Sequence, residues 1–325
     1  MTRSSSRAAV LALAGLALHA SACTSRDGAT REASATEATA RQGAPLADID
    51  WKAVDSALGR RGTMQDGGVY RYGMPRSDLT VTSEGVRIAP ALALGSWLAF
   101  KATGGDEAVA MGDLVLTEAE YGRVIARLQE GDVGQTAVHK HLRQTSPALW
   151  WTHIHARGDP VRIARTVRAA LALTGTPAQD VAGAPPAGPT APIELDTAQI
   201  HQVLGRAGTV SGGVYHVSVP RAETIRAGGI ELPAAMGTAT ALNFQPTGGG
   251  KAAINGDVVM TAAEVNPVIA ALTAHGIQVV AVHNHMLDEE PRLFFLHFWA
   301  NDDAVTLARG LRAALDRTNS ARPAP

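Results

Sequence analysis

The sequence predicts an α+β fold in which one domain occurs twice, each copy an antiparallel sheet with helices on one face. The first observation is a near copy: residues 137–159 reappear at 281–303, and their matching histidines lie 144 residues apart. A period of this length indicates a domain duplication and not a solenoid. The second observation is that the same succession of strand-like and helical segments precedes both copies. With 325 residues, the chain is long enough for two ordinary domains.

The first 47 residues predict export. Arg3 and Arg7 precede an apolar run, 8–18, that is too short to span a bilayer, so residues 1–22 are interpreted as a signal peptide. Residues 23–47 are rich in Ala, Thr, Ser and Glu without apolar periodicity, which predicts a flexible tether. We therefore expect an exported protein of the cell envelope or periplasm.

The only cysteine of the chain, Cys23, follows Ala20, Ser21 and Ala22. This arrangement resembles a bacterial lipobox, in which Cys23 would be lipidated and would become the mature N-terminus. Ala20 stands where such motifs usually carry a large aliphatic residue, so ordinary cleavage after Ala22 remains the alternative. A single cysteine forms no internal disulfide. The sequence predicts a membrane anchor through an N-terminal lipid.

The two repeats are predicted at 48–175 and 196–318, each in the order α-β-β-β-α-β-β-α. Apolar residues at helical spacing open the first repeat, and a GGVY motif shared by both predicts a turn that enters a strand. The pair Gly-Asp, at 112–113 and 256–257, is interpreted as a turn inside strand-like sequence. A threonine and a glutamate three residues apart follow with capping-box spacing in both repeats, as Thr117 with Glu120 and Thr261 with Glu264.

Each of the two histidine-containing windows predicts a hairpin of two strands, because a Ser-Pro or Glu-Pro pair supplies turn residues between them. An aspartate then precedes the last helix of each repeat. Between the repeats, residues 176–195 contain five prolines and predict a stiff, extended linker. Residues 319–325 are a tail. We expect the repeats to pack as a pseudo-two-fold pair.

Three shared motifs resemble the LppY/LpqO family of bacterial lipoproteins. They are GGVY followed by Pro-Arg, GD-x-V-x-T-x-x-E, and an H-x-H pair followed by a proline and a further histidine, most specifically in HNHMLDEEPRLFFLHFW. The resemblance extends over residues 48–318, and known members often carry two such domains. It implies an exported, often lipid-anchored protein of unknown biochemical activity. The chemistry must therefore be argued from the residues themselves.

The main functional feature is the concentration of histidines. The chain has 11, and seven lie in the two windows. His283 and His285 alternate on a predicted strand and so share a face. A register that sets His283 opposite His297 on the partner strand brings these imidazoles within about 5 Å of each other. Three converging imidazoles predict a divalent transition-metal site, with zinc favoured.

The second repeat is the preferred site, since the acidic turn after its H-x-H pair offers a carboxylate, for which we take Glu290, as a further ligand. Asp288, Glu289 and Asp257 are further carboxylate candidates. In the first repeat, the histidines that repeat the arrangement are His139, His141 and His153. That copy is weaker, because Lys140 repels a cation and Thr-Ser replaces Glu-Glu. The structural alternative is a hydrogen-bonded histidine cluster, or histidines stacked on nearby tryptophans.

Three functions remain open. They are an exported metal-binding protein, a metal- or histidine-dependent hydrolase acting on an envelope substrate, and an envelope module that binds a small molecule or glycan without metal. The formal net charge of −1 gives no basic surplus and argues against a nucleic-acid partner. The sequence has no G-x-S-x-G motif, no second cysteine and no H-E-x-x-H motif, so the common hydrolase classes find no support.

Overall fold

The computed structural model describes residues 49–178 and 192–321. The predicted signal peptide, the tether, Cys23, most of the linker and the end of the tail lie outside these ranges. In the described part of the chain, no helix combines the length and apolarity needed to cross a membrane.

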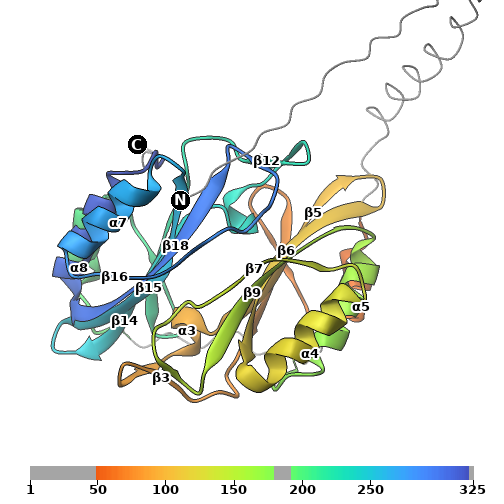
Figure 1. Ribbon diagram of the computed structural model, residues 1–325, viewed down its shortest axis with the longest axis horizontal. Helices are drawn as coiled ribbons and strands as arrows, with labels where there is room; N and C mark the ends of the chain where they lie inside the picture. The colour runs from red at the N-terminus through yellow and green to blue at the C-terminus, as the bar shows by residue number, and fades with distance from the viewer. Residues whose placement is uncertain (1–48, 179–191, 322–325) are drawn as a thin grey trace, which may run out of the picture. The chain divides into compact units, whose positions relative to one another are not determined.

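The first repeat forms a six-stranded sheet of antiparallel neighbours in the order β1-β2-β5-β6-β9-β7 (Figure 1). Helices α4 and α5 pack on one face of this sheet, and α2 packs on α5. Its elements are α2 (Trp51–Leu58), β1 (Thr63–Gln65), β2 (Val69–Pro75), β3 (Val81–Ser83), β4 (Val86–Ile88), α3 (Pro90–Ala93), β5 (Gly95–Gly104), β6 (Glu107–Thr117), α4 (Glu118–Gln129), β7 (Gly134–His139), β8 (Thr145–Ser146), β9 (Leu149–Gly158) and α5 (Pro160–Leu171).

The second repeat has the same topology, in the order β10-β11-β14-β15-β18-β16. Helices α7 and α8 take the places of α4 and α5 (Figure 1). Its elements are α6 (Thr197–Leu204), β10 (Thr209–Ser211), β11 (Val214–Val219), β12 (Arg226–Ala227), β13 (Ile230–Glu231), η1 (Ala234–Met236), β14 (Thr240–Gly248), β15 (Lys251–Thr261), α7 (Val265–Ala274), β16 (Gln278–His283), β17 (Glu289–Glu290), β18 (Leu293–Asp303) and α8 (Ala304–Leu315). The predicted duplicated α+β fold is confirmed.

The predicted Gly-Asp turns are wrong, since both pairs lie in the middle of the long strands β6 and β15. The glycine is explained by close packing. A Cβ on Gly112 would lie 2.6 Å from the carbonyl oxygen of Trp97, and one on Gly256 would lie 1.9 Å from that of Ala241. Gly is therefore required where the neighbouring strand approaches closely. The aspartate that follows each glycine, Asp113 or Asp257, therefore lies within a long strand that is buried on both faces.

The predicted capping box is present at the start of α4, where Thr117 and Glu120 bond each other's backbone. In the second repeat, Glu264 accepts a hydrogen bond from the Thr261 N–H, but α7 begins later, at Val265. Each of these glutamates also forms an ion pair with a buried arginine at the end of a strand. Arg76 lies 2.8 Å from Glu120, and Arg221 lies 2.7 Å from Glu264. These ion pairs hold the start of each helix against its sheet.

Each sheet is buried on both faces. Alternate residues of the central strands point to the helices and form one apolar core per repeat. The other residues point to the opposite face, where the two repeats share two further cores. One contains Met111 of the first repeat with Phe295 of the second, and the other contains Trp151 with Trp299. The repeats therefore pack through the sheet faces that their helices leave uncovered, and we call this contact the inter-repeat face.

A β-bulge occurs at the same place in both hairpins. In the β7–β9 pair the register shifts between Gln135 and Ala137, and in the β16–β18 pair it shifts between Val279 and Ala281. A shift of one residue turns every later side chain to the other face of the strand. The bulge therefore turns His139 and His283, which follow it, to the inter-repeat face.

Candidate metal centre

Six histidines and two aspartates from both repeats meet at the inter-repeat face. Each repeat contributes an H-x-H pair at the end of β7 or β16, a later histidine on β9 or β18, and a strand aspartate on β6 or β15. We call these eight residues the cluster: His139, His141, His153 and Asp113 from the first repeat, and His283, His285, His297 and Asp257 from the second. All are buried except His141, which is half-buried.

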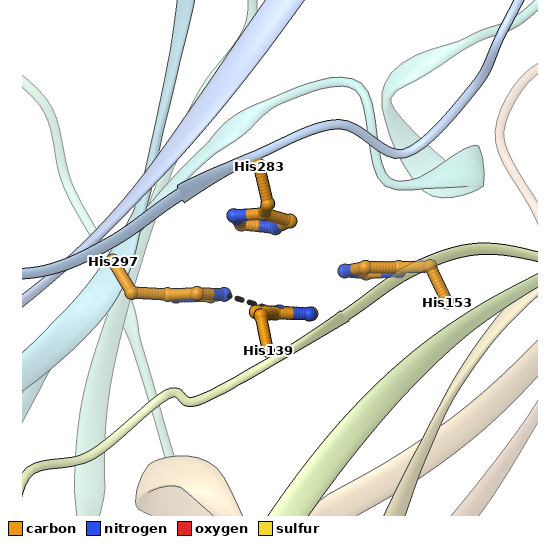
Figure 2. A group of neighbouring side chains, drawn as sticks. All are labelled: His139, His153, His283 and His297. Atoms are coloured by element: carbon orange, nitrogen blue, oxygen red, sulfur yellow. Dashed lines mark hydrogen bonds between the residues drawn. The ribbon is translucent and has the colours of Figure 1, made fainter.

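Four of the histidines come together across the contact between the repeats. Figure 2 shows His139 and His153 on strands of the first repeat, with His283 and His297 facing them from the second. One ring nitrogen from each lies within 4.8 Å of the others. The Nε2 atoms of His139 and His297 are 3.1 Å apart. Four nitrogens so placed can hold one metal ion.

Each strand aspartate lies beside the second histidine of an H-x-H pair. Asp113 Oδ2 is 3.1 Å from His141 Nε2, and Asp257 Oδ2 is 2.9 Å from His285 Nε2. Two three-residue groups can therefore also hold a metal ion, one around each aspartate; they are Asp113, His141 and His153, and Asp257, His283 and His285. The cluster thus contains three overlapping sets of potential ligands.

Hydrogen bonds to main-chain carbonyls fix which ring nitrogen carries the proton. His297 Nδ1 donates to the Gly256 carbonyl at 2.7 Å, and His285 Nδ1 donates to the Gly237 carbonyl at 2.9 Å. In the neutral imidazole the other nitrogen, Nε2, then presents a lone pair, which is the usual ligand form of histidine. In His285 this lone pair faces the Asp257 carboxylate at 2.9 Å. Two electron-rich atoms at that distance repel unless a proton or a metal cation lies between them.

Further buried polar atoms of the cluster have no hydrogen-bond partner among the described residues. They are Asp113 Oδ1, His139 Nδ1, His153 Nε2, Asp257 Oδ1, both ring nitrogens of His283, and His285 Nε2. An unsatisfied buried polar atom costs about 1–3 kcal/mol, so such a concentration requires an explanation. A bound metal ion provides one, because it would occupy the lone pairs.

Burial holds the imidazoles neutral. Desolvation, followed by repulsion from neighbouring histidines, lowers the pKa of His139, His141 and His283 well below the ordinary value. The same burial lowers the pKa of His153 to about 3 and that of His285 to about 4. Neutral imidazole is the form that binds metal. Conversely, burial raises the pKa of Asp257 to about 6.

The structure brings together the six predicted histidines but not the predicted carboxylate. Glu290 lies exposed on β17, paired with Arg226, and belongs to none of the potential ligand sets among the described residues. Glu289 is buried but accepts from the Leu293 N–H and pairs with Arg292. Asp113 and Asp257 take the place expected for Glu290, so the carboxylates come from strands and not from the turn.

The predicted register of the second hairpin is corrected. His297 pairs with Ala281 and His283 with Phe295, so the expected pairing of His283 with His297 does not occur, although their rings still lie 4.6 Å apart between centroids. The ring of His139 also stacks on His283 of the other repeat, with centroids 3.9 Å apart.

The structural alternative is present as well. His139 makes hydrogen-bond contacts with His141 and His297, and His141 stacks on Trp151 and His285 on Phe295. This alternative does not account for the unpartnered nitrogens.

A cavity of about 240 Å³ adjoins the cluster and is lined by both strand aspartates and by His141, His153, His285 and His297. Arg71 also lines it, a role that no sequence motif indicated. Its guanidinium lies 4.0 Å from the ring centre of Trp97 and donates to the Ala235 carbonyl. Burial lowers the pKa of Arg71 to about 10, so it remains charged at neutral pH. The cavity is therefore lined by a cation as well as by the histidines and aspartates.

The chain belongs to the family described as Domain of Unknown Function (DUF1259), which matches at residues 52–173 and again at 198–317. No curated protein matches the sequence. Among solved structures, a trimeric bacterial microcompartment shell protein, PduB, is similar over 81% of this chain and 96% of that chain, at 12% identity and a TM-score of 0.21. The family match establishes the duplication and leaves the function open.

The stability of the metal-free protein should fall steeply as the pH drops below 6.5. Five cluster histidines bind a proton near pH 6.5 in an unfolded chain, whereas in the folded state they resist protonation to lower pH; they are His139, His141, His153, His283 and His285. Each such group therefore removes about 1.4 kcal/mol of unfolding free energy per pH unit. Asp257, with its raised pKa, opposes this below about pH 6, but it is one group against five.

Urea unfolding of the metal-free protein at pH 7, 6 and 5 measures this slope. His139→Asn is the matched variant, because it removes one of the five imidazoles and should reduce the slope by about one proton. An unfolding free energy that is constant between pH 7 and 5 would contradict the expectation.

Proposed function

We propose that the cluster is a divalent transition-metal centre and that metal binding is the function of the duplicated domain. The observation that carries the proposal is the contact between His285 and Asp257. A lone pair, fixed by the hydrogen bond to Gly237, faces a carboxylate oxygen at 2.9 Å inside the protein. A metal ion turns this repulsion into two coordinate bonds.

The donor atoms indicate the kind of ion. The cluster offers imidazole nitrogens and carboxylate oxygens, a set that suits zinc and neighbouring transition metals and not calcium or magnesium, which prefer oxygen alone. We favour zinc, because three or four nitrogen and oxygen ligands form its usual protein site. The buried, neutral imidazoles are ready to bind without first losing a proton.

The purified protein should bind zinc tightly, and His139→Ala or His297→Ala should weaken the binding by more than about 100-fold. That loss exceeds the roughly 10–100-fold cost of removing a group that only supports a ligand. Elemental analysis and calorimetry on protein first stripped with a chelator provide the measurement. His201→Ala, at an exposed position on α6, is the control and should bind as the parent does. Unchanged affinity in both cluster variants would refute the proposal.

The second candidate function is a metal-dependent hydrolase, and the cavity beside the cluster favours it. A metal-bound water at the cluster would face a space of about 240 Å³ that also holds the Arg71 guanidinium. A guanidinium recognises carboxylate and phosphate groups by paired hydrogen bonds. This combination suits a small anionic ester better than a neutral one.

If the protein is such a hydrolase, the zinc-loaded form should cleave p-nitrophenyl phosphate faster than the chelator-stripped form. Arg71→Gln should then lower kcat/KM by about 10–100-fold, the value of a hydrogen bond to a charged group. Arg226→Gln, which removes an exposed guanidinium from β12, is the control. Equal rates for loaded and stripped protein on anionic and neutral esters would leave metal binding as the function.

We further propose that the protein is exported and anchored in the membrane by a lipid on Cys23, as the resemblance to the LppY/LpqO family implies. The support comes from the sequence: a short apolar run with basic residues before it and a lone cysteine after small residues. An anchor of this kind would hold the metal centre near the membrane surface on the flexible tether predicted for residues 23–47.

Cys23→Ser should move the protein from the membrane fraction to the soluble fraction of cells that express the full chain. Loss of the thiol removes the site of lipid attachment, whereas the apolar run itself is too short to span a bilayer. Fractionation followed by immunodetection, with Ser21→Thr as the matched variant next to the cleavage site, makes the comparison. Retention of Cys23→Ser in the membrane would exclude the lipid anchor.

A further inference from the structure

We propose that the cluster holds two metal ions, each bound by the strand aspartate and the H-x-H pair of one repeat together with the later histidine of the other repeat. This inference rests on the proposed metal-binding function. It adds the number of ions per chain and the sharing of one histidine ligand across the two repeats, which we call the exchange. One group comprises Asp113, His139, His141 and His297, which are linked by pairwise contacts, and the other comprises Asp257, His283, His285 and His153.

The distances in the first group fit a shared ion. Two atoms bound to one ion at about 2.0–2.1 Å lie about 2.9–3.4 Å apart in right-angle to tetrahedral geometry. His141 Nε2 lies 3.1 Å from Asp113 Oδ2 and 3.1 Å from His139 Nε2. The Nε2 atom of His297, from the other repeat, lies 3.1 Å from that of His139. Three consecutive contacts therefore link Asp113 to His141, His141 to His139, and His139 to His297.

The second group is the counterpart of the first, with a more open geometry: Asp257, His283 and His285 lie 144 residues further on, and His153 lies 144 residues before His297. Asp257 Oδ2 lies 2.9 Å from His285 Nε2 and 3.9 Å from His283 Nε2. The ring of His153, which the first repeat contributes, lies 3.8 Å from that of His285, measured between centroids. The corresponding rings in the first group, His141 and His297, are 3.7 Å apart. The two groups are therefore related by the internal symmetry of the chain.

The number of donors supports two ions over one. A single ion held by His139, His153, His283 and His297 would leave both strand aspartates outside its ligand set. Burying carboxylates is costly, and the two aspartates line the same cavity, where like charges repel each other. Two ions with four ligands each use all eight donors and place a positive charge beside each carboxylate.

The exchange of the later histidines has a structural consequence. Each ion would bind both repeats, so the pair of ions would link the two sheets across the inter-repeat face. His153 and His297 stand on the long central hairpin strands β9 and β18, and their side chains reach the group of the other repeat. Neither repeat alone then contains a complete four-ligand site.

Stoichiometry tests the number of ions. The chelator-stripped full-length protein is titrated with Co²⁺, whose absorption reports imidazole coordination, and the zinc-loaded protein is measured by elemental analysis. Both should give two ions per chain for the parent and for His201→Ala. One ion per chain would overturn this inference and leave the proposed function standing, whereas no bound ion would refute both.

Pairs of substitutions test the exchange. Asp113→Ala and His297→Ala should each leave one ion, and their combination should still leave one, because both residues serve the same ion. Asp113→Ala combined with His153→Ala should leave none, since these residues serve different ions. The opposite pattern would show that each ion is bound within one repeat and would overturn the exchange. Circular dichroism establishes which variants are folded, and the Co²⁺ titration of the parent gives the stoichiometry independently of all of them.

Discussion

The centre of this molecule depends on the burial of imidazole and carboxylate groups between two apolar sheet faces. Helices cover one face of each sheet, and the other faces cover each other, with Met111, Phe295, Trp151 and Trp299 in the shared cores. Apolar cores of this kind offer no hydrogen-bond partners, so a polar group placed there needs a partner within the protein, in the adjoining cavity or in a bound ion. Main-chain carbonyls accept a hydrogen bond from one ring nitrogen of some cluster histidines, among them His285 and His297. The lone pairs of the remaining ring nitrogens converge.

The sequence predicts much of this architecture because the repeat and the alternation of strands are local signals. The offset of 144 residues identifies the duplication, and period-two alternation places His297 on the same face as Phe295 and Trp299. The register of the hairpin could not be predicted. It depends on a bulge between Val279 and Ala281 that carries no distinctive residue, and this bulge sets the face to which His283 points.

The carboxylate beside the histidines was expected at Glu290 for a similar reason. Proximity in sequence favours Glu290, seven residues after His283, but β17 pairs with β12 and leaves Glu290 exposed. Asp257 is distant in sequence and adjacent in space, because β15 is the neighbour of β18 and sets Asp257 opposite His297. Asp257 was among the carboxylate candidates, but its interpretation as a turn residue favoured Glu290 over it, whereas it lies inside a long buried strand.

The internal symmetry also separates two parts of the site. Each repeat contributes four of the eight residues of the cluster at matching positions, whereas the residues that line the adjoining cavity differ between the repeats. Arg71 corresponds to His216, which bonds Asn243 instead, and Met111 corresponds to Asn255, whose amide donates to the His141 carbonyl. The proposed metal coordination would require only the symmetric part. The lining of the cavity is asymmetric, because a guanidinium, that of Arg71, lies on one side of it. An asymmetric lining is needed to orient an asymmetric ligand, but it is not needed to hold ions.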